Sequence, residues 1–253
     1  MKANAVKSKL RAGDAVYGCF VRHPAPGLFE VMSLQGWDFI VIDGEHGTAD
    51  PADCENITRA IELHDATPIV RVTTNQRHII LRYLDAGPLG LIVPWVSSRA
   101  DAELVVEAVK YHPRGSRGLA FVRAGGYGQF CTLPEYIKWA NRELLITVQV
   151  ETVEAVDNLP DIVAVDEIDV VFIGPSDLSH SYGAPGNLEH PCVQKALNRI
   201  VDVVTSSDKA LGIMVSNATA AQEWRDRGAR FIAIGFEALL RGATRAYLDE
   251  ARG

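Results

Sequence analysis

The stretch Asp38-Phe-Ile-Val-Ile-Asp-Gly-Glu-His46 decides the fold, because an unbroken apolar run ends directly on acidic and imidazole side chains. The run is β-branched and too short for a helix, which indicates a strand buried on both faces. Leu144–Glu151 and Asp169–Asp177 repeat this design. Parallel α/β proteins build their active sites just past the carboxyl ends of such strands. The runs therefore predict one site from the residues on which they end. Those residues are His46, Glu151 and Asp177.

Strands and amphipathic helices alternate along nearly the whole chain. Strands are expected at Ala15–Val21, Phe39–Ile42, Pro68–Val72, Leu89–Val93, Leu145–Val150, Val170–Ile173, Leu211–Val215 and Phe231–Ile234. Helices are expected at Pro51–Leu63, Gln76–Leu84, Ala100–Tyr111, Pro134–Ala140, Pro191–Thr205, Ala218–Arg227 and Glu237–Ala251. Eight strands with intervening helices in 253 residues predict a single domain, residues 1–253, folded as an α/β (β/α)₈ TIM barrel. An open doubly wound sheet is the competitor, but its G-x-G-x-x-G fingerprint is missing.

Composition argues against several classes of partner. The net charge of −7 is unsuited to a nucleic-acid partner, which requires a basic face. No apolar stretch approaches the roughly 20 residues of a membrane helix, and the amino terminus lacks the apolar region of a signal peptide. The four cysteines are far apart and form no CxxC pair, which favours reduced thiols over disulfides or a zinc site. We expect a cytoplasmic protein that binds neither nucleic acid nor membranes.

Glu151 and Asp177 end strands that are consecutive in the chain and therefore neighbours in a barrel. Two converging carboxylates are what a hard divalent ion such as Mg²⁺ or Mn²⁺ accepts, with water and substrate in the remaining positions. Alternatively, each carboxylate caps the helix that follows it, since Gly174-Pro-Ser-Asp-Leu178 also resembles a helix start. For the two residues together, the metal site is the favoured interpretation.

His46 and Arg71 are the other candidates for chemistry. His46 follows Asp43 and Glu45 at a strand end, where an imidazole beside an acidic group suits a general base. Arg71 lies in an otherwise apolar strand and needs an anionic partner, because an unpaired buried charge is costly. That partner is either structural, Asp43 or Asp85, or a substrate carboxylate or oxyanion.

Lysine is absent from the strand ends. A barrel that forms a Schiff base needs a desolvated amine at such a position, and none of the seven lysines occupies one. Covalent imine chemistry is therefore disfavoured, and a metal ion is the natural substitute electron sink.

The segment Tyr111–Gly128 interrupts the alternation with many glycines and arginines. It is interpreted either as a long βα excursion near the site or as a solvated loop.

Several motifs together resemble the HpcH/HpaI aldolases, which are metal-dependent pyruvate aldolases. The motifs are Ile42-Asp-Gly-Glu-His-Gly47, Pro68-Ile-Val-Arg-Val72, Leu84-Asp-Ala-Gly87, Val93-Pro94, Pro113-Arg-Gly-Ser-Arg-Gly118, Val148-Gln-Val-Glu-Thr152 and Phe172-Ile-Gly-Pro-Ser-Asp-Leu178. They occur in the family's order and span about residues 15–240. This chain departs from better-known members after Gly87, where Trp95 replaces a Met, towards the aldehyde side or a subunit contact.

The resemblance implies roles for individual residues. Glu151 and Asp177 match the metal ligands, and His46 matches the base, which is paired with Asp85. Arg71 matches the arginine that binds the pyruvate oxygen and steadies the enolate. Gln149 matches a pocket residue, and the amides of Ser176 and Asp177 match donors to the pyruvate carboxylate. The fold implied is a barrel of the phosphoenolpyruvate/pyruvate type, assembled as a hexamer (a trimer of dimers) with the last helix, about residues 237–251, exchanged between subunits.

The function implied is that of a class II aldolase, a lyase that uses Mg²⁺, Mn²⁺ or Co²⁺. It would cleave a 4-hydroxy-2-oxo acid into pyruvate and an aldehyde through a pyruvate enolate. One alternative is a citrate-lyase-like enzyme acting on a CoA thioester, which would need a basic rim, and only Arg114, Arg117 and Arg123 offer one. A second alternative is an isomerase or binding barrel with a phosphate site at Gly228–Gly235.

Overall fold

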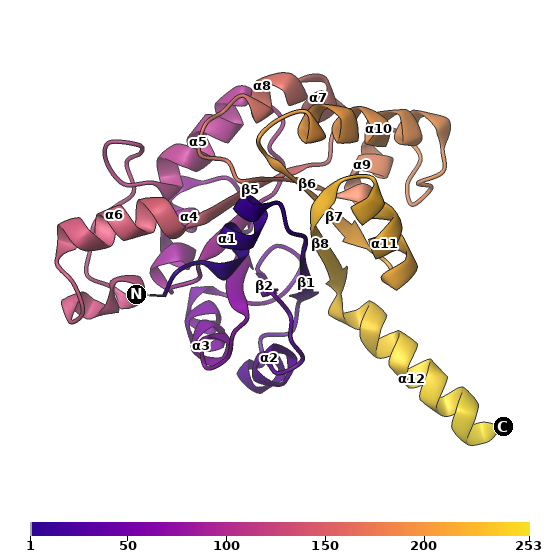
Figure 1. The fold of residues 1–253 in the computed structure, drawn as a ribbon, viewed down its shortest axis with the longest axis horizontal. Coiled ribbons are helices and arrows are strands. Elements are labelled where there is room, and N and C mark those ends of the chain that lie inside the picture. Colours follow the sequence, from indigo (N-terminus) through magenta and orange to yellow (C-terminus); the bar gives the residue numbers. More distant parts are fainter. Residues whose placement is uncertain (1) are drawn as a thin grey trace.

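Eight parallel strands pair in chain order and close into a barrel in the computed structural model, which describes residues 2–253 (Figure 1). The strands are β1 (Val16–Val21), β2 (Phe39–Asp43), β3 (Thr67–Arg71), β4 (Gly90–Val93), β5 (Leu145–Val150), β6 (Val170–Ile173), β7 (Ala210–Val215) and β8 (Ala229–Gly235). β1 pairs with β8 in parallel, so the sheet has no free edge. The predicted (β/α)₈ barrel is confirmed, and each expected strand is present.

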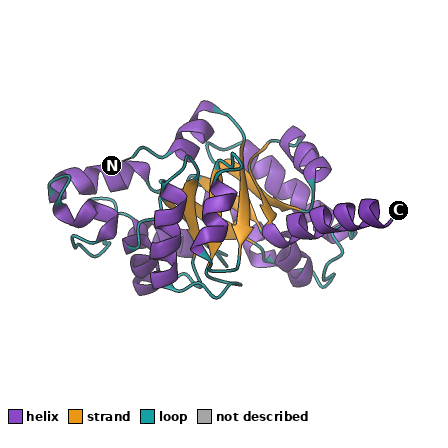
Figure 2. Ribbon diagram, turned by 90° about the horizontal axis from the view of Figure 1, so that it is seen from below, coloured by secondary structure: helices purple, strands orange, loops and turns teal. Residues whose placement is uncertain are grey.

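Helices surround the barrel and return the chain from one strand to the next (Figure 2). The expected ones are α3 (Pro51–Glu62), α4 (Arg77–Asp85), α5 (Arg99–Val109), α6 (Leu133–Glu143), α10 (Pro191–Thr205), α11 (Ala218–Asp226) and α12 (Phe236–Arg252). The sequence did not indicate α1 (Ala5–Ala12), α2 (Pro26–Ser33), the 3₁₀ helix η1 (Arg123–Gly128), α7 (Val153–Asp157), α8 (Leu159–Val163) or α9 (Pro175–Ser181). These helices have at most eight residues, too few for a clear apolar period.

Apolar side chains fill the inside of the barrel, and helix α1 closes its N-terminal end. Val6 and Leu10 of α1 belong to the same buried cluster as the inward-facing strand residues. Within that cluster the rings of Phe39 and Phe231 stack with centroids 4.1 Å apart. Gly18 makes room for them, because a Cβ at this position would lie 2.1 Å from the Phe39 ring. Since the lower end is plugged, the chemistry of the barrel is confined to the C-terminal mouth.

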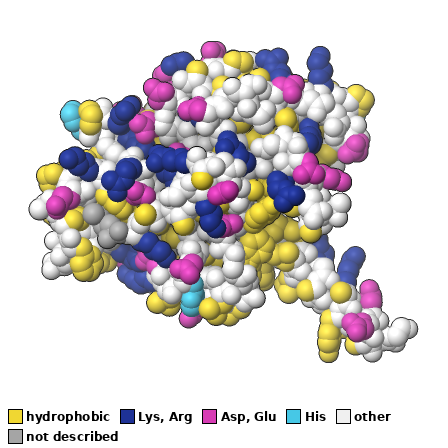
Figure 3. Space-filling model, in the orientation of Figure 1, with side chains coloured by type: hydrophobic (Ala, Val, Ile, Leu, Met, Phe, Trp, Pro, Cys, Tyr) yellow, Lys and Arg dark blue, Asp and Glu magenta, His cyan; other side chains and the backbone are white. Residues whose placement is uncertain are grey.

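Helix α12 projects away from the barrel, and none of its residues is buried (Figures 1 and 2). Apolar side chains gather beside its base (Figure 3), where a cavity of about 410 Å³ is lined by residues including Tyr17, Trp37 and Leu239. The expected helix over 237–251 is therefore present, and its apolar surroundings are exposed in the single chain. Among the described residues, no helix combines the length and the apolar character needed to cross a membrane.

The segment Tyr111–Gly128 lies at the N-terminal end of the barrel, so a βα excursion beside the site is wrong for the single chain. The segment follows α5, which has already carried the chain back from the mouth. Arg117 donates to Asp85 at the end of α4, and Arg123 donates to the carbonyl of Ala86. These two contacts hold the segment against the N-terminal end of the barrel, and the Arg117 side chain is buried there.

Candidate active site

A buried ion pair joins the ends of β2 and β3. Asp43 and Arg71 are the last residues of these strands and are opposite one another in the sheet register. Arg71 donates from Nε to Oδ1 of Asp43 at 2.9 Å and from Nη2 to Oδ2 at 2.7 Å. Burial alone would raise the pKa of Asp43, but the hydrogen bonds and charge of Arg71 outweigh it and hold that pKa below its ordinary value. Arg71 and Asp43 thus form a fixed, bidentate ion pair, which we call the arginine clamp.

The turn after β2 folds back onto this clamp. The amides of Glu45 and His46 both donate to Oδ1 of Asp43 at 3.2 Å. Gly47 permits the reversal, because a Cβ there would lie 2.2 Å from the carbonyl oxygen of Asp43. The Glu45 carboxylate reaches Arg71, with Oε2 3.0 Å from Nη1. The turn thereby places an exposed His46 imidazole at the mouth and gives Arg71 a second carboxylate.

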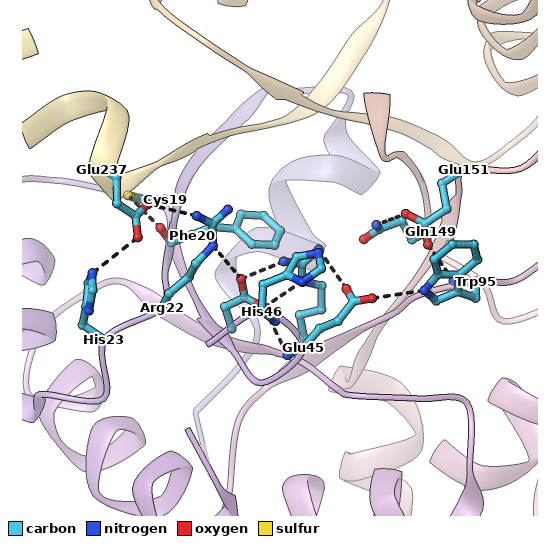
Figure 4. A network of polar contacts seen from close by, with 12 residues as sticks. Cys19, Phe20, Arg22, His23, Glu45, His46, Trp95, Gln149, Glu151 and Glu237 are labelled. Carbon is cyan, nitrogen blue, oxygen red and sulfur yellow. Dashed lines mark hydrogen bonds and ion pairs between the residues drawn. The ribbon is translucent and has the colours of Figure 1, made fainter. Parts of the chain in front are cut away.

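Glu151 follows β5 and is only 1% exposed, yet no cationic side chain within residues 2–253 pairs with it. Its oxygens accept from the amide of Trp95 at 2.8 Å and from the side-chain amide of Gln149 (Figure 4). Burial raises the pKa of Glu151 to about 7, and the charges of Glu45 and Asp177 push it in the same direction. Glu151 is therefore a buried carboxylate whose negative charge the protein leaves uncompensated.

Asp177 lies in the first turn of α9, close enough for its charge to act on Glu151. The helix-capping alternative is not supported for either carboxylate. Helix α9 has no side-chain cap, and α7 is capped by the Thr152 hydroxyl rather than by Glu151.

The residues around Glu151 fit a hard divalent ion. Glu151 and Asp177 offer oxygen ligands from neighbouring strand ends, and the buried Oε1 of Gln149 has no hydrogen-bond partner. Among residues 2–253, no three His, Cys, Asp or Glu side chains are grouped so as to hold an ion by themselves. Water and substrate would therefore complete the coordination, as is usual for Mg²⁺.

The structure does not bring Asp85 to this site. Asp85 is the last residue of α4, at the N-terminal end of the barrel, and its carboxylate accepts from Arg117 at 2.8 Å. His46 lies at the opposite end, so the two cannot pair within one chain. Reasoning from strand ends gave little reason to choose Asp85, and the structure explains why.

Sequence reasoning missed Arg22 and the part played by Trp95. Arg22 directly follows β1, which is the same strand-end signal that identified the other residues. Trp95 has a left-handed backbone, with φ of 58°, which directs its amide towards Glu151. Its indole N–H contacts Oε1 of Glu45 at 3.2 Å, so one residue touches both carboxylates (Figure 4). No local sequence signal predicts a positive φ at a tryptophan.

Comparison with known proteins identifies the family. A family profile described as HpcH/HpaI aldolase/citrate lyase matches residues 16–241. The 5-keto-4-deoxy-D-glucarate aldolase of Escherichia coli (strain K12) is 35% identical over 248 residues, 97% of this chain and 96% of the relative. An HpcH/HpaI aldolase/citrate lyase family protein from Burkholderia cenocepacia J2315 superimposes with a TM-score of 0.94 at 32% identity, covering 99% and 100% of the two chains. Citrate synthase SbnG gives a TM-score of 0.87 at 30% identity, covering 97% and 96%. The chain belongs to the HpcH/HpaI aldolase/citrate lyase family.

Proposed function

We propose that the protein is a divalent-metal-dependent aldolase that cleaves a 4-hydroxy-2-oxo acid into pyruvate and an aldehyde. The observation that carries this proposal is the buried, uncompensated Glu151 beside Asp177, at the same barrel mouth as a pre-organised arginine. Family membership and the aldolase relative support the same reaction class. The proposed setting is the cytoplasm.

Glu151 and Asp177 would hold the ion, which we propose to be Mg²⁺, Mn²⁺ or Co²⁺. When bound, such an ion polarises a keto oxygen and stabilises negative charge that develops on it. The free Oε1 of Gln149 lies beside Glu151 and is available to an ordered water or a substrate hydroxyl. The amides of Ser176 and Asp177, in the first turn of α9, would face the pyruvate carboxylate.

Arg71 is placed to bind the oxygen of pyruvate and to offset the charge of its enolate. The guanidinium has five N–H donors. Two of them are committed by hydrogen bonds to the two oxygens of Asp43, and Nη1 makes an ion pair with Glu45, which leaves donors on Nη1 and Nη2 for substrate. Because Asp43 and Glu45 fix the orientation beforehand, no reorganisation is needed when charge develops.

His46 is the proposed base. Its imidazole takes the proton from the C4 hydroxyl, the C3–C4 bond breaks, and the bonding electrons pass into the pyruvate enolate. The aldehyde leaves, and protonation of C3 gives pyruvate. Because Asp85 lies at the far end of the same barrel, we propose that the Asp85 paired with His46 belongs to a neighbouring subunit of a hexamer, a trimer of dimers. Exchange of α12 in that assembly would cover the apolar surface at its base.

The alternatives have less support. Arg117 and Arg123 are engaged with Asp85 and Glu62 below the barrel, so they form no basic rim for CoA at the mouth of this chain. Gly228 precedes β8 and therefore lies at the opposite end of that strand from Gly235. Of this segment, therefore, only Gly235, which precedes α12 at the mouth, is placed to form half of a phosphate site.

A retro-aldol screen tests the proposal. Several 4-hydroxy-2-oxo acids are incubated with Mg²⁺, Mn²⁺ or Co²⁺, and released pyruvate is measured. We expect chelation, Glu151→Gln or Asp177→Asn to abolish release. Full activity after chelation and dialysis would contradict the metal role, and a borohydride-trapped adduct with pyruvate would restore the imine alternative.

Exchange of the pyruvate methyl protons tests the base. His46→Ala should slow exchange into D₂O sharply, whereas the matched control His190→Ala should not. His190 is exposed at the start of α10, where it contacts Cys192. An unchanged exchange rate in His46→Ala would remove His46 from the mechanism.

A further inference from the structure

Arg22 lies across the barrel mouth from the proposed metal site. It directly follows β1, and Glu151 directly follows β5. In a closed barrel of eight strands in chain order, β1 and β5 have three strands between them on either side and are diametrically opposite. Figure 4 shows Arg22 and Glu151 at opposite sides of the network, with His46 and Glu45 between them. A ligand that starts at Glu151 and extends across the mouth therefore approaches Arg22.

The guanidinium of Arg22 is poorly occupied by the protein. The side chain is 43% exposed, with Nε 3.4 Å from Oδ2 of Asp43 and Nη1 3.7 Å from Oε2 of Glu237. Both separations exceed those of a good hydrogen bond. Asp43 is already bound through both oxygens by Arg71, so it needs no further donor. Arg22 thus keeps most of its donors free in the part of the chain that the structure describes.

A carboxylate already lies beside Arg22. Glu237, in the first turn of α12, has one oxygen 3.7 Å from Arg22 and the other 3.5 Å from Nε2 of His23 (Figure 4). The position shows that a carboxylate fits between the guanidinium and the imidazole at the mouth. Because these contacts are long and partly exposed, Glu237 is a weak internal occupant that a tighter anion can displace.

We propose that Arg22, with His23 beside it, is the subsite for a negatively charged group at the far end of the aldehyde acceptor. The inference rests on the proposed aldolase function and adds the residue that would contact the anionic group of the acceptor, whether a carboxylate or a phosphate. A planar guanidinium binds either group through two hydrogen bonds. Arg22 touches no reacting carbon, so it determines specificity and does not take part in catalysis.

A purely supporting role is the alternative. Arg22 would then only balance the two carboxylates around Arg71, and its loss would disturb Arg71. That effect would weaken the enzyme equally with every aldehyde, because Arg71 acts on the pyruvate half. A subsite, in contrast, discriminates between charged and neutral acceptors. Comparing matched acceptors therefore separates the two roles.

The test measures kcat and KM for aldol addition of pyruvate to succinic semialdehyde and to the neutral pentanal. Glyceraldehyde 3-phosphate and glyceraldehyde form a second pair that decides between carboxylate and phosphate. The variants are Arg22→Gln, Arg22→Lys and Glu237→Gln. Arg99→Gln is the control, because Arg99 is an exposed arginine whose ion-pair partner, Glu103, lies on the same helix, α5.

We expect Arg22→Gln to lower kcat/KM for the preferred anionic acceptor roughly 10- to 100-fold, mostly through KM, as loss of a charge-assisted hydrogen bond predicts. Its neutral counterpart should change less than about twofold. Arg22→Lys should retain part of the discrimination, and Glu237→Gln should increase it by removing the competing carboxylate. Arg99→Gln should behave as the parent protein.

Equal losses with charged and neutral aldehydes would overturn the subsite and assign Arg22 a positioning role. A parent protein that prefers the neutral member of each pair would overturn it as well. These outcomes leave the aldolase proposal intact. If the parent protein adds pyruvate to no aldehyde with any metal, the proposed function itself fails.

Discussion

The two halves of the barrel mouth treat their charges in opposite ways. At the ends of β2 and β3, Arg71 binds two carboxylates, and the pKa of Asp43 is held low. At the ends of β5 and β6, Glu151 is equally buried but receives only amide donors, and its pKa rises to about 7. Fold and burial are alike in the two halves, so the difference lies in the partner.

This contrast shows which half of the mouth has its charges paired before any ligand binds. A buried charge is tolerated when it is paired, as Asp43 is, and is costly when it is not. The β2–β3 half is ready before any ligand arrives. The β5–β6 half gains a matching charge only when a cation binds, which supports the proposed metal site. Removing charge should accordingly have opposite effects on stability in the two halves.

Arg71→Met should have the largest effect. It leaves the fully buried Asp43 carboxylate without its two hydrogen bonds from Arg71 and with only the longer contact to Arg22, which costs about 3–5 kcal/mol of the free energy of unfolding. Urea denaturation at about pH 7.5, where Asp43 is ionised, measures this loss. The control Arg59→Met removes an exposed pair with Glu55 and should cost less than about 1 kcal/mol.

The double variant Asp43→Asn/Arg71→Met sharpens this prediction. Because the buried Asp43 carboxylate is neutralised and only the partly exposed Glu45 loses its cation, the double variant should lose less stability than Arg71→Met alone. Because the pKa of Asp43 is lowered in the folded protein, its stabilising contribution is present above the unfolded pKa and is lost as the pH falls. A double variant less stable than Arg71→Met would contradict this account of the clamp.

Glu151→Gln should instead increase the free energy of unfolding of the metal-free protein. The pKa of Glu151 is about 7 in the folded protein against 4.5 ordinarily, so the folded state keeps a proton that the unfolded state loses. The metal-free parent therefore loses stability as the pH rises through this window, and the glutamine variant does not. Near pH 8 we expect the variant to be more stable by roughly 2–3 kcal/mol.

Urea denaturation between about pH 5 and pH 8 in the presence of a chelator checks this prediction. The difference between the parent and the variant should shrink towards the acidic end. A constant difference across the range would show that Glu151 does not titrate there. Added Mn²⁺ should stabilise the parent and leave the variant nearly unchanged.

Gly174→Ala should have a smaller effect, confined to the β5–β6 half. A Cβ at Gly174 would lie 2.5 Å from Oε2 of Glu151 and 2.9 Å from Nε2 of Gln149. Glu151 must shift, at a cost of about 1–3 kcal/mol, and Mn²⁺ affinity should fall. Gly27→Ala is the control, since a Cβ there meets nothing within 4 Å. Unchanged Mn²⁺ affinity in Gly174→Ala would show that the position of Glu151 is unimportant for the ion.

The sequence predicted the barrel well because buried parallel strands consist of continuous runs of apolar, β-branched residues. The runs that end at His46 and at Glu151 were placed at the mouth from this pattern alone, and Arg71 was placed within a buried strand. Asp43 was already one of the expected partners of Arg71. The local residue pattern therefore predicts most of the fold and the position of the site, because both depend on where the strands end.

Features that depend on contacts between distant segments were not predictable. One of the two interpretations of segment 111–128 put it near the site because it follows the fourth strand, but α5 had already reversed the chain. Asp85 entered through the family resemblance and lies below the barrel in the single chain. The amide that Trp95 directs at Glu151 depends on a positive φ, which the residue type does not encode. Arg22 carries the strand-end signal, but its acidic neighbours come from other elements, Asp43 from β2 and Glu237 from α12, so its surroundings were not predictable.

Trp95→Phe should have the smallest effect and tests whether the two halves are independent. Trp95 connects them, through its indole N–H to Glu45 and its backbone amide to Glu151. The variant loses only the exposed indole contact, so the free energy of unfolding should change by less than about 0.5 kcal/mol. In a double-mutant cycle with Glu151→Gln, independent halves give additive effects within about 0.5 kcal/mol. A larger coupling energy would mean that the tryptophan transmits the charge state of Glu151 to the arginine clamp, because Glu45 contacts Arg71 directly.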